Sequence, residues 1–365
     1  MKVALVHHYL LNMRGGERVL EMFCEIFPQA DIFTLVYNES VISDKIKGHN
    51  INTSFLQKLP FAKTKWRYYL PLFPFASEQL DLRNYDIVIS SDSACIKGVI
   101  TRSDTLHICY CHTPMRYAWD LYFDYLDELP KAGKEIAHLI MHYIRQFDFR
   151  AAQQVDYFIA NSRNTARRIK KYYRRDSQII YPPVDTDFFK IDTKQATDNF
   201  YLYVGELVPY KRANLIVKSF NELNRPLKVI GNGPQFQHLK KIARDNIELL
   251  GRQPRQVVKH YFQRCKAFVF AAEEDFGITP LEAQACGKPV IAFKKGGAVE
   301  TIINGKTGIF FDHQTVDSLI SAVEKYETLT FDPKICRDNA TRFSGTIFRK
   351  RIKNFVIKKY NNLKM

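Results

Sequence analysis

Residues 265–291 read CKAFVFAAEEDFGITPLEAQACGKPVI, and they are the most informative part of the chain. The apolar run at 266–272 predicts a short buried parallel strand, and the acidic, glycine-containing segment after it predicts a turn. Thr279 is a good helix N-cap, Pro280 fits the first helical position, and Glu282 follows three residues after the cap. Strand, turn, helix and strand in this order predict free helix amides at the carboxyl edge of a sheet, where open α/β folds bind phosphates and nucleotides.

The same residues also have a purely structural interpretation, because Thr279 and Glu282 form a T-x-x-E capping box that requires no ligand. Glu273, Glu274 and Asp275 favour a binding site instead, because three adjacent acids repel one another and would not stabilise a purely structural loop. Carboxylates accept hydrogen bonds from vicinal hydroxyls, and helix amides hold a diphosphate. The segment therefore predicts a site for a polyhydroxylated, phosphorylated ligand.

Strand-like and helix-like segments alternate along the chain in two blocks, separated by a proline-containing segment at 181–189 and a polar connector at 192–199. The first block has a helix after its first strand, at 17–27, and candidate strands at 3–7, 32–36, 87–90, 106–110 and 157–161. The second block has candidate strands at 201–205, 227–231, 247–250, 267–271, 289–293 and 308–311. This alternation predicts an α/β fold with parallel sheets and right-handed crossovers.

Composition limits the classes of function. The 365 residues suffice for two domains, and 54 basic against 38 acidic residues give a formal charge of +16, which favours phosphate-bearing partners or an anionic membrane. A basic, tyrosine-containing helix at 167–175 raises the alternative of nucleic acid, but no nucleic-acid module accompanies it, so a solvated helix face is favoured. The seven cysteines follow neither a disulfide nor a zinc pattern, and the N-terminal apolar run is too short for a secretory or transmembrane segment. These features favour a reducing compartment.

The spacing of Glu274 and Glu282 around Phe276-Gly277-Ile278 resembles the signature of the retaining glycosyltransferases of family 4, which have the GT-B fold of two Rossmann-like parallel-sheet domains facing across a cleft. Further segments resemble this family and occur in its order: GGERV at 15–19, YCHTP at 110–114, ANS at 160–162, YPPVD at 181–185, GELVPYKR at 205–212 and GNGP at 231–234. The phrases CHTPMRYAWD, VPYKR and EEDFGITPLEAQA are most similar to mannosyltransferases of bacterial surface polysaccharide assembly.

The resemblance implies a domain organisation. It places an acceptor-side domain at 1–190, a nucleotide-sugar donor domain at 191–342, and a basic helix at 343–365 that crosses back to the first domain. Alternatively, this helix only packs against the fold.

The resemblance also implies donor-binding roles for individual residues. Lys211, with Arg212, would neutralise the diphosphate, and this matters more here because Glu206 stands where many family members have an arginine. Glu282 would bind the ribose hydroxyls and Glu274 the hydroxyls of the donor sugar. The amides of the loop and helix start would reach sugar and phosphate; they belong to Phe276, Gly277, Ile278 and Thr279. The glycine loop of Gly15 and Gly16 would close over the diphosphate, and Gly231, Asn232 and Arg252 would flank the base.

His112 is implied to face the donor sugar, so that His112 and Glu274 are the candidate catalytic residues. We assign His112 a role in positioning the sugar and stabilising charge, with His7 and His8 nearby. Retention implies that the acceptor hydroxyl attacks from the face that the diphosphate leaves, with no covalent intermediate. Asp185-Thr186-Asp187 has a metal-like spacing but follows two prolines in the connector, so we expect no divalent metal and no cofactor beyond the nucleotide sugar.

The segment at 61–75 combines cations with aromatic residues, a composition typical of interfacial segments. Lys63, Lys65, Trp66 and Arg67 would contact a membrane; in the alternative, the segment is a core-packed helix whose lysines extend to water. Arg18 and Arg116 are candidates for binding an acceptor phosphate.

Together these features predict a cytoplasmic, peripherally membrane-associated, retaining glycosyltransferase. We expect it to move mannose from GDP-mannose onto a lipid-linked oligosaccharide in surface polysaccharide biosynthesis. The alternatives are a UDP-sugar transferase of the same family and a GT-B epimerase; a phosphorylase is disfavoured because no pyridoxal-binding lysine context is found. A non-enzymatic alternative is a basic nucleic-acid binder, although we expect no nucleic acid as partner.

Overall fold

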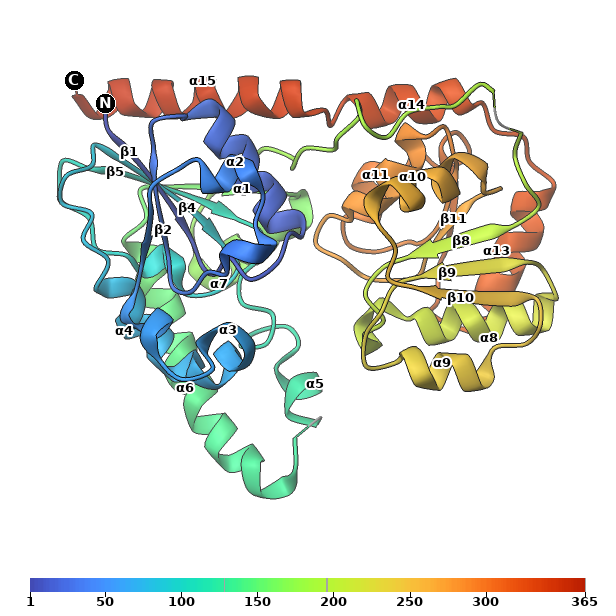
Figure 1. Cartoon of the computed structure of the whole chain (residues 1–365), viewed down its shortest axis with the longest axis horizontal. Coiled ribbons are helices and arrows are strands. Elements are labelled where there is room, and N and C mark those ends of the chain that lie inside the picture. The colour runs from blue at the N-terminus through green and yellow to red at the C-terminus, as the bar shows by residue number, and fades with distance from the viewer. Residues whose placement is uncertain (128, 195, 365) are drawn as a thin grey trace. The chain divides into compact units, whose positions relative to one another are not determined.

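The chain divides into two compact units, and the computed structural model describes residues 1–127, 129–194 and 196–364. Unit 1 comprises Met1–Pro183 and the chain from Phe348 onward, and unit 2 comprises Val184–Ile347. Each unit is a Rossmann-like α/β layer structure around one parallel sheet (Figure 1). The predicted fold class is therefore confirmed for both units.

The sheet of unit 1 has the strand order β3-β2-β1-β4-β5-β6-β7, and every pair described is parallel. Its strands are β1 Val3–His7, β2 Asp31–Thr34, β3 Ile51–Thr53, β4 Ile87–Asp92, β5 Leu106–Cys111, β6 Tyr157–Ala160 and β7 Ser177–Ile179. All residues of the central strands β1, β4 and β5 are buried, as in a parallel sheet covered on both faces.

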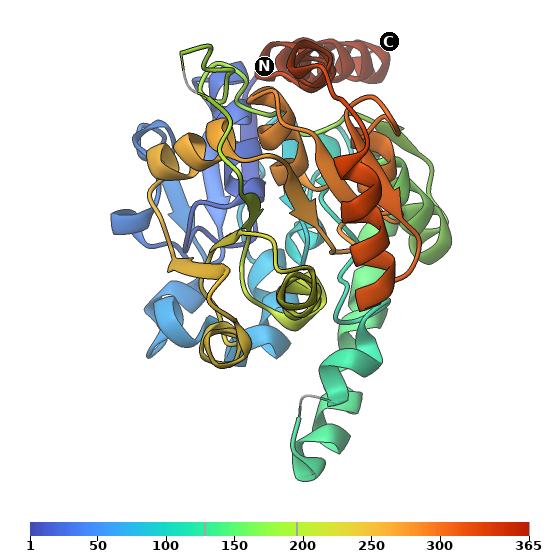
Figure 2. The same cartoon turned by 90° about the vertical axis from the view of Figure 1, so that its right-hand side faces the viewer.

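Helices cover both faces of this sheet. The helices of unit 1 are α1 Gly15–Ile26, α2 Asp44–Lys47, α3 Ala62–Lys65, α4 Phe73–Glu78, α5 Tyr122–Asp127, α6 Lys131–Gln153, α7 Arg163–Tyr173 and most of α15 Gly345–Lys364, with 3-10 helices at Glu39–Val41, Phe55–Lys58, Trp66–Leu72 and Ile96–Gly98. Side chains of α1, α2 and α15 share one core cluster with Leu5 and Ile89 of the sheet, whereas α3, α4 and α6 share another with Val6 and Val88. The α5–α6 pair, green in Figures 1 and 2, extends away from the sheet of its unit.

The terminal helix α15 buries Phe348, Ile352 and Val356 among the core residues of unit 1, and Phe355 packs partly against the same cluster. These residues recur at helical spacing, so one stripe of an otherwise basic helix is apolar. Arg349 on this helix forms an ion pair with Glu25 of α1 at 2.7 Å. The helix therefore closes one face of the unit 1 sheet.

The sheet of unit 2 has the strand order β10-β9-β8-β11-β12-β13. Its strands are β8 Tyr201–Val204, β9 Leu227–Ile230, β10 Ile247–Gly251, β11 Phe268–Phe270, β12 Val290–Phe293 and β13 Gly308–Phe311. Its helices are α8 Ala213–Leu223, α9 Phe236–Ile242, α10 Arg255–Arg264, α11 Ile278–Ala285, α12 Ala298–Thr301, α13 Val316–Glu327 and α14 Pro333–Thr341, with a 3-10 helix at Pro209–Lys211. Each strand of this unit overlaps the segment that the sequence predicted.

The start of α11 differs from its prediction. The helix begins at Ile278, with Gly277 as N-cap in the left-handed conformation (φ 81°), and no side chain caps it. Thr279 was predicted as the N-cap, and this prediction is wrong: it lies inside the first turn. Glycine adopts positive φ without the steric penalty of a Cβ, so the chain can turn into the helix earlier than the capping-box pattern indicated.

No helix among the described residues is long and apolar enough to cross a membrane. All seven cysteines are buried, and each is a free thiol in the described chain.

Candidate active site

The candidate residues of unit 2 gather where its strand order reverses. The chain runs outward from β8 to β10 and then returns to place β11 on the other side of β8. Lys211 follows β8 and Glu274 follows β11, so both lie at the carboxyl ends of the two strands that flank this switch point. Open parallel sheets bind their ligands at such a point.

Lys211 and Glu274 form an ion pair there, with 2.9 Å between Nζ and Oε1 and 21% of each side chain exposed. Burial lowers the pKa of the Lys211 ammonium, but Glu274 outweighs this effect, so the pKa lies above its usual value. Lys211 is therefore a fixed cation at neutral pH. Arg212, the next residue, is the N-cap of α8 and has the left-handed conformation (φ 57°), a strained backbone for a residue with a side chain.

Two glycines that the sequence reasoning missed hold the acidic turn in place. Gly296 and Gly297 follow β12, and the Gly297 amide donates a 2.8 Å hydrogen bond to the Glu274 carbonyl. A Cβ on Gly296 would lie 2.3 Å from that carbonyl oxygen, and a Cβ on Gly297 would lie 2.2 Å from the Phe276 Cα. Only glycine permits this backbone approach. The signal in the sequence was the Gly-Gly pair that follows a buried strand after two lysines.

The predicted helix-start residues lie together beyond this turn. Phe276 is buried, Gly277 caps α11, and Ile278 and Thr279 form its first turn. The amides of Gly277, Ile278 and Thr279 are among the N–H groups at a helix start that an α-helix leaves without an internal partner. Glu282 lies one turn further along the same helix and is half-buried.

The predicted base-flanking residues lie at the ends of β9 and β10. The Gly231 amide donates to the Gly251 carbonyl at 2.9 Å, and a Cβ on Gly231 would lie 1.8 Å from the Gly205 carbonyl oxygen. These glycines bring the ends of β8, β9 and β10 close together. Asn232 and Arg252 follow β9 and β10 and are exposed at this edge.

The candidate residues of unit 1 also gather where strand order reverses, between β1 and β4. Gly15 and Gly16 open α1, and His112 directly follows β5. A Cβ on Gly16 would lie 3.5 Å from His7 Cε1 and 3.7 Å from His112 Nε2, so this glycine lies against both imidazoles. The structure therefore brings together the glycine loop and the histidine that the sequence singled out.

His112 is held through its backbone by three elements. Its amide donates to the Asp92 carbonyl at 2.8 Å, and its carbonyl accepts from Asn161 Nδ2 at 2.8 Å and from Thr165 Oγ1 at 3.3 Å. The Ala160-Asn161-Ser162 motif thus contributes by orienting His112. Burial, and then the neighbouring His7, lower the pKa of the His112 imidazole to about 3. The ring is neutral at physiological pH, which suits hydrogen bonding better than charge stabilisation.

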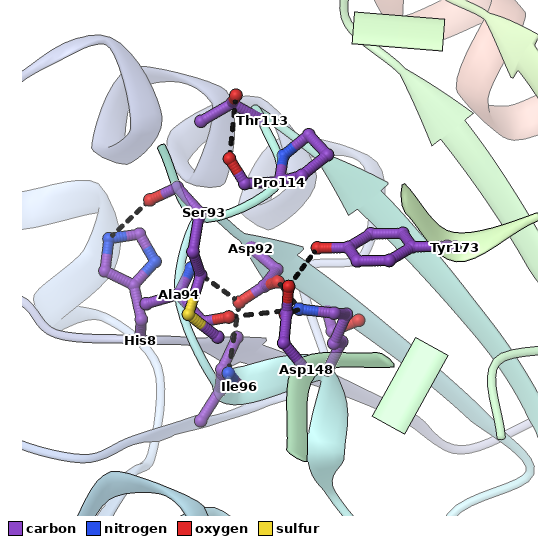
Figure 3. Close-up of polar contacts among 12 residues, drawn as sticks. His8, Asp92, Ser93, Ala94, Ile96, Thr113, Pro114, Asp148 and Tyr173 are labelled. Atoms are coloured by element: carbon purple, nitrogen blue, oxygen red, sulfur yellow. Dashed lines mark hydrogen bonds and ion pairs between the residues drawn. The ribbon is translucent and has the colours of Figure 1, made fainter. Parts of the chain in front are cut away.

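A buried polar network around Asp92 and Asp148 fixes the end of β4, the strand whose last carbonyl accepts from the His112 amide (Figure 3). Asp92 accepts from the amides of Ala94 and Ile96 at 3.1 and 3.0 Å and from Lys97 Nζ at 3.0 Å. Lys97 also binds Asp148, whose second oxygen accepts from Tyr173 at 2.9 Å and from Trp119 Nε1 at 2.7 Å.

Lys97 and both carboxylates of this network are at most 1% exposed. Burial lowers the pKa of Lys97 and raises that of Asp92, but the two carboxylates outweigh burial at Lys97, whose pKa lies well above its usual value. We treat Lys97 as charged because it contacts two carboxylates. No pattern in the sequence indicated this network, because its two carboxylates, Asp92 and Asp148, lie far apart along the chain.

The segment predicted to meet a membrane is partly core. Phe73 is buried, and Trp66 is half-buried, with its ring 4.0 Å from that of Tyr9 and the Arg67 guanidinium 4.9 Å above it. In contrast, Phe61 and Tyr68 are 70% and 80% exposed. Lys63 and Lys65 are exposed beside them.

The remaining candidate residues lie outside these two clusters. Arg18 on α1 pairs with Glu21 at 2.8 Å, and Arg116 is half-buried after β5. Asp185 pairs with Arg255 at 2.8 Å, and no group of three or more potential metal ligands is found among the described residues.

Comparison with known proteins gives two family matches that meet near the connector. Residues 13–188 match the Glycosyltransferase Family 4 model, and residues 184–343 match the model of glycosyl transferases group 1. A GDP-mannose-dependent α-(1-6)-phosphatidylinositol monomannoside mannosyltransferase of Mycolicibacterium smegmatis is 27% identical over 221 residues, which are 52% of this chain and 58% of that protein. The α-1,3/1,6-mannosyltransferase ALG2 of Saccharomyces cerevisiae is 26% identical over 272 residues, 59% of this chain and 52% of its own. The chain thus spans about half the length of the curated relatives it matches.

Solved structures resemble the whole chain in fold. Sucrose-phosphate synthase from Thermosynechococcus elongatus superposes with a TM-score of 0.74 over 99% of this chain and all of its own, at 14% identity. HepE of Anabaena in complex with UDP-glucose superposes with a TM-score of 0.70 over 98% of this chain and 100% of its own, also at 14% identity. The lipopolysaccharide outer core galactosyltransferase WaaB superposes with a TM-score of 0.66 over 98% of this chain and 100% of its own, at 18% identity. At these identities the likeness establishes the fold, which is GT-B.

Proposed function

Since the chain belongs to the glycosyltransferases, with a family 4 N-terminal half and a group 1 C-terminal half, we propose that it transfers a hexose from a nucleotide sugar to an acceptor hydroxyl. The observation that carries this proposal is the Lys211–Glu274 pair at the switch point of unit 2. A fixed cation beside an acidic turn and a free helix start offers complementary groups to a diphosphate and to sugar hydroxyls.

In this proposal Lys211 binds the diphosphate and stabilises the charge that develops on it as it leaves. The amides at the start of α11 face the same anion, and Glu274 accepts hydrogen bonds from the donor sugar. Glu282 binds the ribose hydroxyls, while Asn232 and Arg252 flank the base. In unit 1, Gly15 and Gly16 allow the backbone to come close to the diphosphate, and the neutral His112 orients the sugar.

The reaction retains the anomeric configuration and needs no covalent enzyme intermediate. The acceptor oxygen forms a bond to the anomeric carbon while the bond between that carbon and the phosphate oxygen breaks. The electron pair stays on the departing phosphate oxygen, which takes the proton of the acceptor hydroxyl. Cationic and amide groups suffice to stabilise this leaving group, so we propose that the enzyme works without a divalent metal.

We further propose mannose as the sugar and GDP-mannose as the donor. The mannosyltransferases of M. smegmatis and S. cerevisiae support this choice, whereas HepE in complex with UDP-glucose supports the alternative of a UDP-sugar. The proposed acceptor is a lipid-linked oligosaccharide of surface polysaccharide assembly, met at the cytoplasmic face of a membrane. The formal charge of +16 and the exposed Phe61 and Tyr68 beside Lys63 and Lys65 support contact with an anionic bilayer.

Donor turnover tests the proposal. The enzyme is incubated with GDP-mannose, UDP-glucose or UDP-N-acetylglucosamine, with and without a chelator, and release of the nucleotide diphosphate is measured with a membrane lipid extract as acceptor source. Chelator-insensitive release from GDP-mannose alone is the expected result. Release from a UDP-sugar instead overturns the mannose assignment and keeps the transferase, and release from none of the donors contradicts the proposed reaction.

A further inference from the structure

Four side chains of unit 1 form a continuous polar relay, which runs from Glu17 through His7 and Ser91 to His112. Glu17 Oε1 lies 3.7 Å from His7 Nε2, His7 Nδ1 lies 3.0 Å from Ser91 Oγ, and Ser91 Oγ lies 2.8 Å from His112 Nε2. His7 and Ser91 are fully buried and Glu17 is 3% exposed, whereas His112 keeps part of its surface exposed. The relay thus connects a buried carboxylate to an accessible imidazole.

Glu17 is anchored at the start of this relay. Its Oε2 accepts a 2.8 Å hydrogen bond from the Arg14 amide, which caps α1. Its other oxygen, Oε1, is the one that faces His7. Burial raises the pKa of the Glu17 carboxyl, but the neighbouring His7 outweighs this effect, so the pKa lies below its usual value. Glu17 is therefore a carboxylate, and a helix cap alone would require only one of its oxygens.

The carboxylate determines where the proton of a neutral His7 lies. His7 Nε2 is buried and has no hydrogen-bond partner among the described residues. A proton on Nε2 faces the negative charge of Glu17, whereas a lone pair there would be repelled by it. With the proton on Nε2, His7 Nδ1 is an acceptor.

The acceptor role of His7 Nδ1 in turn determines where the protons of Ser91 and His112 lie. Ser91 donates its single hydroxyl proton to His7 Nδ1, so its oxygen must accept from His112 Nε2. His112 then carries its proton on Nε2 and a lone pair on Nδ1. Among the described residues, none forms a hydrogen bond with His112 Nδ1, so this lone pair remains available to a ligand.

We propose that Glu17, His7 and Ser91 are positioning residues that fix His112 as the Nε2-protonated tautomer, which presents Nδ1 as an acceptor for a hydroxyl of the substrate. The part that concerns the substrate rests on the proposed function, because a sugar hydroxyl is the donor that Nδ1 would meet. The part that concerns the tautomer rests on the geometry of unit 1 alone.

Glu17→Gln tests the tautomer directly. The oxygen of the new amide stays on the Arg14 N–H, since only an oxygen can accept there, and the amide NH₂ turns to His7. His7 Nε2 becomes an acceptor, its proton moves to Nδ1, and Ser91 is turned to donate to His112 Nε2. The variant keeps the helix cap and the shape of the side chain, yet it reverses every donor and acceptor along the relay.

The readout is ¹⁵N NMR of the His112 imidazole in the full-length protein at pH 8, above the ordinary histidine pKa of about 6.5. We expect a protonated Nε2 in the wild type and a protonated Nδ1 in Glu17→Gln. Glu25→Gln, which makes the same change further along α1, should keep the wild-type tautomer. A wild type with its proton on Nδ1, or a Glu17→Gln variant with unchanged tautomer, overturns the proposal.

Kinetics give the second readout. Glu17→Gln is expected to lower kcat/KM about tenfold, the effect of one misdirected hydrogen bond of about 1.4 kcal/mol. Ser91→Ala removes the link without touching Glu17, so it should give a similar loss, and the double variant should be no worse than either single one. Additive losses overturn the relay.

Ser91→Ala also covers the case in which Glu17→Gln fails to fold, because the relay then predicts a mixture of His112 tautomers. If the tautomer reverses as expected but the wild type transfers no sugar, the proposed function fails while the relay stands. If the wild type transfers sugar but its tautomer does not depend on Glu17, the relay fails alone.

Discussion

Lys211 Nζ lies 2.9 Å from Glu274 Oε1, across the point where the strand order of unit 2 reverses. The two residues are far apart in the sequence, and each follows a different strand. Their ion pair joins the cation proposed for the diphosphate to the carboxylate proposed for the sugar. It holds both groups in place before any donor binds, which reduces the cost of ordering them on binding.

A double-mutant cycle of Lys211→Met and Glu274→Gln should reveal this coupling in the free energy of unfolding. We expect a coupling of about 1 kcal/mol, because the pair is mostly buried but still meets solvent. The more exposed pair Lys228–Glu248, whose side chains are 27% and 55% exposed, serves as the control and should give less. Equal couplings in the two pairs would count against a preformed site.

The pH dependence of that coupling has a definite sign. The pKa of Lys211 is raised in the folded state, so its stabilising contribution is complete below the ordinary lysine pKa and is lost only as pH rises beyond it. The coupling measured in urea should therefore be constant from about pH 6 to 9. A decline within this range would show that Lys211 is not the fixed cation described.

Gly296→Ala should weaken donor binding, because its Cβ would lie 2.3 Å from the Glu274 carbonyl oxygen and push the acidic turn aside. Gly305→Ala is the matched control: both glycines have positive φ, at 63° and 74°, but nothing lies within 4 Å of a Cβ on Gly305. We expect the control to lose about 1 kcal/mol of stability from backbone strain alone and to keep its affinity for donor in calorimetry. Equal affinities in the two variants would contradict the role given to Gly296.

Lys97→Met should destabilise unit 1 by about 3–5 kcal/mol, since it leaves the buried carboxylates of Asp92 and Asp148 without their cation. Urea unfolding followed by circular dichroism measures this loss. Lys353→Met, an exposed lysine of α15, should change stability by less than about 0.5 kcal/mol. A small effect at Lys97 would mean that the network is not held by charge.

Acid should destabilise unit 1 partly through His112. Its pKa is about 3 in the folded state, so unfolding takes up a proton as pH falls below the ordinary histidine value, and stability is lost. Between pH 7.5 and 5 this is worth up to about 2 kcal/mol. His112→Asn should lose correspondingly less stability over that interval in urea titrations, whereas the exposed His142→Asn should follow the wild type.

The sequence predicted the central strands from short apolar runs, such as Ile87-Val88-Ile89 at the start of β4. It did not predict β3 or β7, which have three residues each, lie at the sheet edges and contain exposed or half-exposed positions. Such strands carry little periodicity, and their pairing is decided by the neighbouring strand. The start of α11 was misplaced for a related reason: a glycine in left-handed conformation leaves a weaker pattern than a capping box.

The candidate residues in each unit could be identified from local sequence motifs, but the residues with which they form ion pairs and hydrogen bonds could not. Lys211 and Glu274 were each singled out, yet the sequence gives no indication that they pair. The relay from Glu17 through Ser91 to His112 depends on strand order, which sets β1 beside β4 and β4 beside β5. Serine and glutamate are common in any chain, so only the fold distinguishes these two from the rest.

Calorimetric titration of GDP-mannose into the wild type, Lys211→Ala and Lys218→Ala shows whether Lys211 belongs to the donor site. Lys218 is an exposed lysine of α8 and leaves the site untouched. We predict that the wild type and Lys218→Ala bind the donor equally, and that Lys211→Ala loses affinity at least about tenfold, since a charged hydrogen bond to phosphate is removed. Equal binding by all three proteins would show that the Lys211–Glu274 pair is not the donor site, which would contradict the proposed function.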